Sequence, residues 1–210
     1  MQRSNLLNRM EQTGAMAIVR TKSIERAHEI AQGCLDGGID VLEISYTYPN
    51  AGEVIAALKE TFQDRLVVGA GTVLEGETAR MAIMKGAEFI ISPNFKERVA
   101  RLCNLYQIPY CPGCSTGTEI VEALEAGASM IKAFPIANFY GSDLVTIYKT
   151  PMPYVPVLAS GGISLDNLAE WVEAGTEICA FGSLLTKGTT AEIAANAVKI
   201  KTIIDSTRSK

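Results

Sequence analysis

The sequence has one histidine, no excess of basic residues and no long apolar run, and each shortage argues against a class of function. A net charge of -4 argues against a general nucleic-acid binder, which would usually be basic. No apolar run approaches the length that crosses a bilayer, and residues 1–14 lack the apolar core of a secretory signal. We therefore expect a cytoplasmic protein without nucleic-acid or membrane partners.

The cysteines do not form a pattern that predicts a disulfide framework. The five cysteines are odd in number and scattered, so we expect reduced thiols at Cys34, Cys103, Cys111, Cys114 and Cys179. Cys111 and Cys114 have CxxC spacing, but the one histidine that could join a zinc site, His28, lies far upstream. A thioredoxin-like motif would open a helix near the start of its domain, whereas this pair follows a strand midway along the chain. We interpret the pair as strand-end residues and expect no metal or cofactor, with redox or metal binding as the alternative.

Short apolar, β-branched segments alternate with amphipathic helical segments along the whole sequence. The strand-like segments are residues 16–19, 41–44, 66–69, 89–92, 109–111, 130–133, 155–158 and 178–181. The helix-like segments are residues 23–35, 51–61, 75–84, 96–106, 118–125, 143–148, 165–172 and 190–204. Near-continuous apolar strands with helical crossovers predict a parallel sheet that is covered on both faces. Eight such units favour a closed (β/α)8 TIM barrel, and a short helix at residues 5–12 is expected to cap its N-terminal end.

Small-residue turns separate helices from the strands that follow. Gly38, Gly86, Gly127 and Gly175 each come just after a helix-like segment, where glycine can adopt the left-handed conformation that closes a helix. No linker, low-complexity tract or composition shift marks a second domain. We therefore expect residues 1–210 to form a single barrel domain.

A lysine in the sixth strand-like segment is the strongest candidate for chemistry. Lys132 lies in an apolar run that ends at Pro135, so its amine must either reach an edge of the sheet or be held inside for a reaction. Burial disfavours a charged amine and so raises the fraction of neutral amine that can attack a carbonyl. A snorkelling lysine at a strand end is the alternative.

Other candidates stand where the predicted strands end, because (β/α)8 barrels carry their active sites at the carboxyl ends of the strands. Glu43 lies inside the second strand, as a general acid/base or as one half of a structural ion pair with Lys132. Arg20 ends the first strand, where its planar guanidinium suits a substrate carboxylate, unless it is a surface residue. The Gly-Ala-Gly run of residues 69–71 before Thr72 could be only a tight turn.

The last two loops predict a phosphate site. Ser160, Gly161 and Gly162 end the seventh strand, and Gly182 and Ser183 follow the eighth. Such barrels commonly bind phosphate there, because glycines let backbone N–H groups approach the anion, although simple turn glycines are the alternative. Lysine, carboxylate and glycine loops together indicate Schiff-base cleavage of a phosphorylated keto compound, in which the amine attacks the ketone and the glutamate moves protons.

These residues lie in motifs through which the chain resembles the 2-keto-3-deoxy-6-phosphogluconate and 4-hydroxy-2-oxoglutarate aldolase family. The motifs stand in register at the predicted strand ends: AIVR at 17–20, VLEIS at 41–45, VGAGTV at 68–73, ISP at 91–93, PG at 112–113, IKAFP at 131–135, SGGI at 160–163 and GS at 182–183. The resemblance implies a metal-free class I aldolase, typically a homotrimer. Such enzymes cleave 2-keto-3-deoxy-6-phosphogluconate to pyruvate and glyceraldehyde 3-phosphate, as in the Entner–Doudoroff route.

The resemblance also implies roles for individual residues. Lys132 would be the Schiff-base lysine and Glu43 the general acid/base. The pyruvate pocket would be formed by Arg20, Thr72, Pro93 and Phe134, and the phosphate would be held by Ser160, Gly161, Gly162, Gly182 and Ser183.

Two departures from the family pattern leave the substrate open. No arginine follows the strand-2 glutamate within residues 45–49, and Ala159-Ser160 stands where relatives commonly have Pro-Thr. Substrates derived from 6-phosphogalactonate, or 4-hydroxy-2-oxoglutarate, are therefore alternatives. Two rival functions are a phosphate-binding barrel that acts as an isomerase or epimerase, and a non-catalytic protein that binds a phosphorylated sugar acid.

Overall fold

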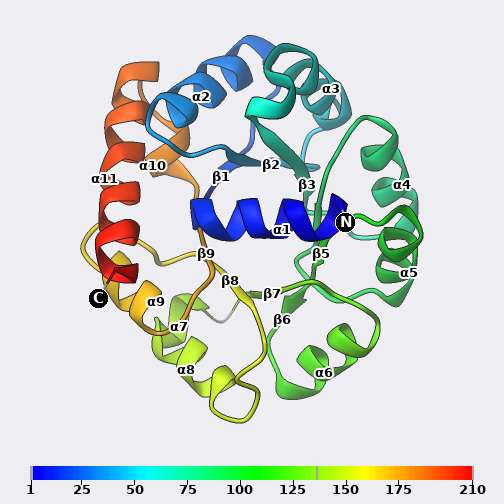
Figure 1. Ribbon diagram of the computed structural model, residues 1–210. Helices are drawn as coiled ribbons and strands as arrows, with labels where there is room; N and C mark the ends of the chain where they lie inside the picture. Colours follow the sequence, from blue (N-terminus) through cyan, green and yellow to red (C-terminus); the bar gives the residue numbers. More distant parts are fainter. Residues whose placement is uncertain (1, 136, 210) are drawn as a thin grey trace.

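The computed structural model describes residues 2–135 and 137–209, and over these residues the chain forms a nearly closed parallel barrel (Figure 1). Its strands are β1 (Ala15–Val19), β2 (Val41–Ser45), β3 (Val67–Gly71), β4 (Ile90–Ile91), β5 (Tyr110–Cys111), β6 (Gly113–Cys114), β7 (Ile131–Ala133), β8 (Val157–Ser160) and β9 (Ile178–Phe181). Their order in the sheet is β5-β4-β3-β2-β1-β9-β8-β7-β6, and each paired strand runs parallel to its neighbour. The predicted TIM-type barrel is confirmed.

Helices surround the barrel and connect its strands (Figure 1). They are α1 (Gln2–Thr13), α2 (Ile24–Asp36), α3 (Ala51–Phe62), a 3-10 turn (Gln63–Arg65), α4 (Gly76–Met84), α5 (Glu97–Tyr106), α6 (Gly117–Glu125), α7 (Ala137–Tyr140), α8 (Asp143–Lys149), α9 (Leu168–Glu173), α10 (Ser183–Thr186) and α11 (Thr190–Arg208). Capping boxes start α6 and α11, where a threonine and the glutamate three residues later satisfy each other's backbone N–H groups. The sequence does not predict the short helices α7 and α10. None of the helices in the described part of the chain combines the length and apolar character that crossing a membrane requires.

Two of the strands whose bounds differ from the prediction have a proline at the changed end. The predicted fifth strand, residues 109–111, corresponds to β5 alone, and Pro112, which has no amide hydrogen to donate, separates β5 from β6, a strand that the sequence does not predict. Because β5 pairs with β4 and β6 pairs with β7, this short segment closes the ring. The seventh strand begins at Val157 instead of residue 155, since Pro156 lacks the same donor, and it extends to Ser160.

Glycines contribute in two different ways. The predicted helix-closing role is confirmed by φ angles between +83° and +97° at Gly38, Gly86, Gly127 and Gly175. Gly69 and Gly71 instead lie within β3, so the tight-turn alternative is wrong. A methyl group on Gly69 would overlap the ring of Phe89, so the barrel interior has no room for a side chain at this position.

Side chains alternate along each strand between the barrel interior and the surrounding helices. The interior cluster consists of Met10, Met16, Ile18, Val41, Val67, Phe89, Ile91, Cys111, Met130, Leu158, Ile178 and Ala180. Met10 comes from α1, and Leu6 of the same helix packs against this cluster. Helix α1 therefore closes the amino-terminal end of the barrel, as predicted, and crosses it in Figure 1. The opposite end carries the candidate site.

Candidate active site

Lys132 and Glu43 project into the barrel from opposite sides of the ring. Glu43 is the middle residue of β2 and Lys132 the middle residue of β7. The two neighbours of each pack in the outer apolar shell, so the side chains of Glu43 and Lys132 must point inward. Glu43 is 1% exposed and Lys132 is 7% exposed. The barrel therefore encloses an amine and a carboxyl group in an otherwise largely apolar interior.

The carboxylate of Glu43 occupies space that Gly71 provides. Gly71 lies on the neighbouring strand β3, and a methyl group there would overlap both Oε1 and Cδ of Glu43. The other oxygen, Oε2, is buried without a hydrogen-bond partner. Across residues 2–135 and 137–209, no ion pair joins Glu43 to Lys132 or to another cation. The structural ion pair that the sequence allowed is therefore not formed, and a buried proton acceptor is left without a partner.

Phe134 and Pro93 lie at the same end of the barrel as the lysine. The Nζ atom of Lys132 is 4.8 Å from the centroid of the Phe134 ring, which is a cation–π distance. Lys132 is in register with Gly113, and a methyl group on Gly113 would overlap the carbonyl of Pro93. Both predicted pocket residues are half-buried. Phe134 thus directly follows β7, the strand of Lys132, and Pro93 lies against the neighbouring strand β6.

Thr72 has an unusual backbone conformation at the end of β3. Its φ of +57° is rare for a β-branched residue, and such strain costs about 1–3 kcal/mol. Its hydroxyl forms a 2.8 Å hydrogen bond with the hydroxyl of Ser45, which is buried at the end of β2. Arg20, directly after β1, is exposed and makes no ion pair or hydrogen bond within the described part of the chain. A guanidinium and a hydroxyl pair therefore flank the strand that carries Glu43.

Ser45 is a polar residue of this site that sequence reasoning did not assign. It stands two residues after Glu43 on the same strand, so the alternation that turns Glu43 inward also applies to Ser45. That spacing is the signal that could have identified it.

Cys111 contributes a buried thiol to the interior beside these residues. Burial, followed by the charges of Cys103 and Glu43, raises the pKa of the Cys111 thiol to about 12, while Lys132 acts in the opposite direction. The thiol is therefore neutral at ordinary pH. Cys111 and Cys114 end β5 and β6 as free, buried residues, which agrees with their interpretation as strand-end cysteines.

The two glycine loops line one pocket. Its volume is about 230 Å³, and its walls include Gly161, Gly162, Gly182 and Ser183. The amide hydrogens of Gly161, Gly162 and Ser183 find no acceptor within residues 2–135 and 137–209. Unpaired N–H groups around a cavity can bind an anion. Ser160 is buried at the end of β8, two residues after an interior leucine, so its side chain faces the barrel instead.

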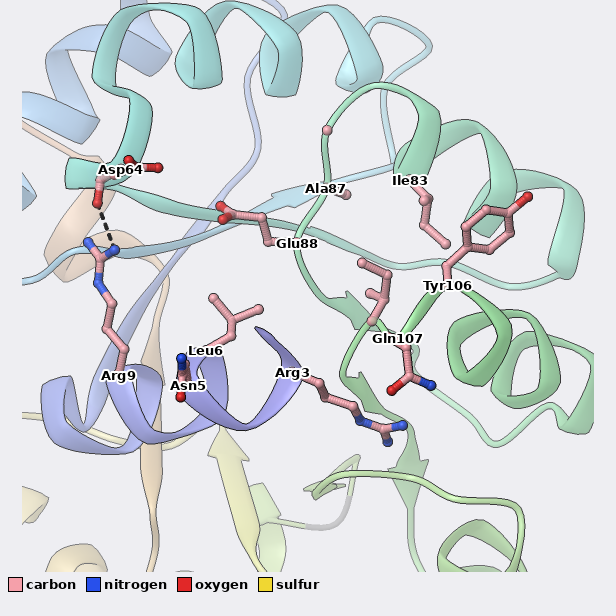
Figure 2. Close-up of a pocket in the computed structure, with 12 residues that line it drawn as sticks. Arg3, Asn5, Leu6, Arg9, Asp64, Ile83, Ala87, Glu88, Tyr106 and Gln107 are labelled. Atoms are coloured by element: carbon pink, nitrogen blue, oxygen red, sulfur yellow. Dashed lines mark hydrogen bonds between the residues drawn. The ribbon is translucent and has the colours of Figure 1, made fainter. Parts of the chain in front are cut away.

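A larger pocket, of about 880 Å³, lies at the opposite end of the barrel and holds none of the predicted residues (Figure 2). It is bordered by α1 and by the segments that precede β3, β4 and β5. Its arginines already have partners: Arg9 donates to the Asp40 carboxylate and to the backbone of Asp64, and Arg3 donates to Asn104. We therefore place the chemistry at the carboxyl ends of the strands, where catalytic groups of this fold lie.

The fold and this site define a (β/α)8 barrel enzyme with an interior lysine and carboxylate, and comparisons with known proteins identify its family. The model of the KDPG and KHG aldolase family matches residues 6–202. The chain is 36% identical over 163 residues to the 2-dehydro-3-deoxy-phosphogluconate aldolase of Treponema pallidum, covering 78% of this chain and 77% of the relative. It is 35% identical over 190 residues to the 2-dehydro-3-deoxy-6-phosphogalactonate aldolase of Escherichia coli, covering 88% and 92%.

Solved structures agree with these relatives. A structure described as native KDPGal matches with a TM-score of 0.87 and 31% identity, over 93% of this chain and 96% of that chain. A KDPG aldolase from Legionella pneumophila, with pyruvate captured as a covalent carbinolamine, matches with a TM-score of 0.80 and 26% identity, over 98% of both chains. The chain therefore belongs to the KDPG and KHG aldolase family. It is a carbon–carbon lyase of the class I, Schiff-base type.

Proposed function

We propose that this aldolase cleaves a 2-keto-3-deoxy-6-phospho sugar acid to pyruvate and glyceraldehyde 3-phosphate, with Lys132 as nucleophile and Glu43 as general acid/base. The observation that carries the proposal is the inward projection of both side chains, with one Glu43 oxygen buried and unpartnered. A buried carboxylate without a partner is costly, so its retention favours a functional role over a structural one.

The chemistry requires only these two side chains and water. The Lys132 amine attacks the C2 ketone to form a carbinolamine, which loses water and becomes an iminium ion. Glu43 then takes the proton of the C4 hydroxyl, the C3–C4 bond breaks, and its electron pair moves into the enamine. The aldehyde leaves, C3 of the enamine is protonated, and hydrolysis of the iminium ion releases pyruvate and the free lysine. Glu43 would return the proton that it accepted to C3.

The remaining predicted residues are proposed to bind the two charged ends of the substrate. The Arg20 guanidinium, which has no partner among the described residues, and the Thr72 hydroxyl would hold the carboxylate. Phe134 and Pro93 would limit the pocket around the keto carbon, and Ser160 would face the chain of the substrate. The phosphate would occupy the pocket of Gly161, Gly162, Gly182 and Ser183, whose unpaired N–H groups support that assignment.

The gluconate-derived acid, as in the Entner–Doudoroff route, is the proposed substrate, and the galactonate-derived acid is the second candidate. The second candidate is favoured by the match to a phosphogalactonate aldolase, which covers 92% of that relative. The two substrates differ in configuration at C4, the carbon whose hydroxyl Glu43 is proposed to deprotonate, and both can undergo the same sequence of steps. A direct comparison of kcat/KM values for both acids and for 4-hydroxy-2-oxoglutarate decides which is preferred.

We also propose that the whole chain is one domain, that it works in the cytoplasm, and that it assembles as a homotrimer. A charged phosphorylated acid does not cross a bilayer freely, so the enzyme must share the compartment where the acid is made. The apolar side chains of Met81 and Met84 on α4, and of Leu105 and Tyr106 on α5, are exposed in the single chain. Exposed apolar side chains on two helices that contact each other favour burial against further copies.

Cleavage kinetics test the proposed roles. Pyruvate release should be lost in Lys132→Ala, whereas Glu43→Gln should slow turnover by at least about 100-fold, since general catalysis contributes on that scale. Lys199→Ala, which removes an exposed lysine of α11, is the matched control and should keep the parent rate. Cleavage by Lys132→Ala at the parent rate would overturn the assignment of the nucleophile. A parent rate for Glu43→Gln would transfer the proton chemistry to another group.

A further inference from the structure

We infer that Asn138 is a specificity-determining residue that binds the phosphate of the substrate. The residue lies on α7, the short helix that follows the Lys132 segment of the chain (Figure 1). No predicted motif includes it. The inference rests on the proposed function, because it names a further ligand of the same anion.

The first observation is the position of the Asn138 carboxamide against the turn of Gly161 and Gly162. A methyl group on Gly161 would overlap Oδ1 of Asn138 and would lie 3.1 Å from its Nδ2. A methyl group on Gly162 would lie 3.2 Å from the same Oδ1. Asn138 therefore lies against two glycines of the 230 Å³ pocket, although it is not itself one of the residues that line the pocket.

The second observation is that the Asn138 carboxamide has donors to spare. Its side chain makes no hydrogen bond to any residue in the described ranges 2–135 and 137–209, although it lies in van der Waals contact with the turn. A primary amide carries two N–H donors, and neither is used within these ranges. The residue is exposed, so a ligand can reach it from solvent.

The third observation is the absence of charge around the pocket. Among the described residues that line it, none is a lysine, arginine, aspartate or glutamate. A phosphate bound there must be held by neutral donors, namely backbone N–H groups and hydroxyl or amide side chains. Asn138 supplies an amide side chain beside the glycine turn, whereas the amide of Asn167 already donates to the carbonyl of Gly162.

The consequence is a dependence on phosphate that can be separated from the aldol chemistry. Loss of one hydrogen bond to a charged group should raise KM for a phosphorylated substrate by about tenfold in Asn138→Ala. Asn138→Asp places a negative charge beside the dianion and should raise KM by about 100-fold or more. Both variants should leave kcat and KM for unphosphorylated 4-hydroxy-2-oxoglutarate within about twofold, because no phosphate is present.

The experiment compares these variants with the parent and with Thr146→Asp, which adds the same charge at an exposed position of α8. Steady-state kinetics are measured on 2-keto-3-deoxy-6-phosphogluconate and on 4-hydroxy-2-oxoglutarate, and inorganic phosphate is tested as a competitive inhibitor. We expect the inhibition constant of phosphate to rise in Asn138→Asp and to stay at the parent value in Thr146→Asp. Trapping of pyruvate on the enzyme with borohydride is measured in every variant.

The outcomes separate this inference from the proposed function. If Asn138→Asp traps pyruvate normally and keeps the parent KM for the phosphorylated acid and the parent inhibition constant of phosphate, the role of Asn138 is overturned and the aldolase mechanism is left intact. An equal loss of kcat/KM on the phosphorylated and unphosphorylated acids also overturns it, because that pattern indicates that the substitution disturbs the structure of α7. Absence of pyruvate trapping in the parent enzyme overturns the proposed function, and the inference with it.

Discussion

Replacement of Gly71 by alanine tests how the barrel positions its general acid/base. The new methyl group would overlap Oε1 and Cδ of Glu43, so the carboxylate must retreat by about 1.5 Å to regain ordinary contact. A displacement of about 1 Å can cost about 100-fold in rate, which corresponds to about 2.7 kcal/mol of transition-state stabilisation. We expect kcat to fall by about that factor, while pyruvate still forms an imine with Lys132.

The matched control for this substitution is Gly117→Ala. A methyl group on Gly117 meets no atom within 4 Å, so both kcat and thermal stability should stay at the parent values. Overpacking in Gly71→Ala should cost about 1–3 kcal/mol of stability, measured by urea unfolding. Glu43→Asp shortens the carboxylate side chain and should make Gly71→Ala less harmful in the double variant than in the parent background. A Gly71→Ala enzyme with parent kcat, or a double variant with purely additive losses, would refute the reasoning.

Four further expectations follow from other parts of the structure. Thr72→Gly should be more stable than Thr72→Val by about 1 kcal/mol in urea unfolding, because φ is +57° at this position. Equal stabilities would show that the backbone of Thr72 is not strained. Both variants should bind pyruvate more weakly than the parent enzyme. Met10→Ala should lose about 2–5 kcal/mol of stability at an unchanged kcat, since Met10 is fully buried at the far end of the barrel, whereas exposed Met84→Ala should change stability by less than about 0.5 kcal/mol. Burial raises the pKa of Cys34, Cys111 and Cys179 to about 12, above their unfolded value near 9. Their contribution to the free energy of unfolding is therefore complete below pH 9 and is lost between pH 9 and pH 12. Urea unfolding across that range should show the decline, and a flat profile would contradict it. The double variant Met84→Glu, Leu105→Glu should be monomeric in light scattering, whereas Val198→Glu on α11 should remain the proposed trimer. A trimeric double variant would show that α4 and α5 do not form the interface.

The sequence predicts most of the fold because its signals are local. The eighth predicted strand, residues 178–181, coincides with β9, and the helix-closing glycines have the expected left-handed backbone. Apolar periodicity and glycine conformation depend on a few neighbouring residues, so they can be read from the chain. The division of β5 from β6 at Pro112 is also a local effect, although it depends on which partners need an amide hydrogen at that point.

The sequence predicts less of the candidate site, since its details depend on contacts between distant segments. Alternation within β2 and β7 was sufficient to turn Glu43 and Lys132 inward. The role of Gly71 required the pairing of β2 with β3, and the residue was open to interpretation as part of a turn. Asn138 meets Gly161 only after the chain has folded, and no periodicity or motif brings the two together. The sequence therefore identifies which groups can react, whereas the structure identifies the residues that position them.

Covalent trapping of pyruvate is the most direct measurement of the central claim. The enzyme is incubated with pyruvate, reduced with borohydride, digested and mapped by mass spectrometry, with Lys132→Ala and Lys199→Ala treated in parallel. We expect the reduced adduct on Lys132 alone, in the parent and in Lys199→Ala, and no adduct in Lys132→Ala. An unmodified Lys132 in an enzyme that still releases pyruvate, or an adduct on a different lysine, would contradict the account.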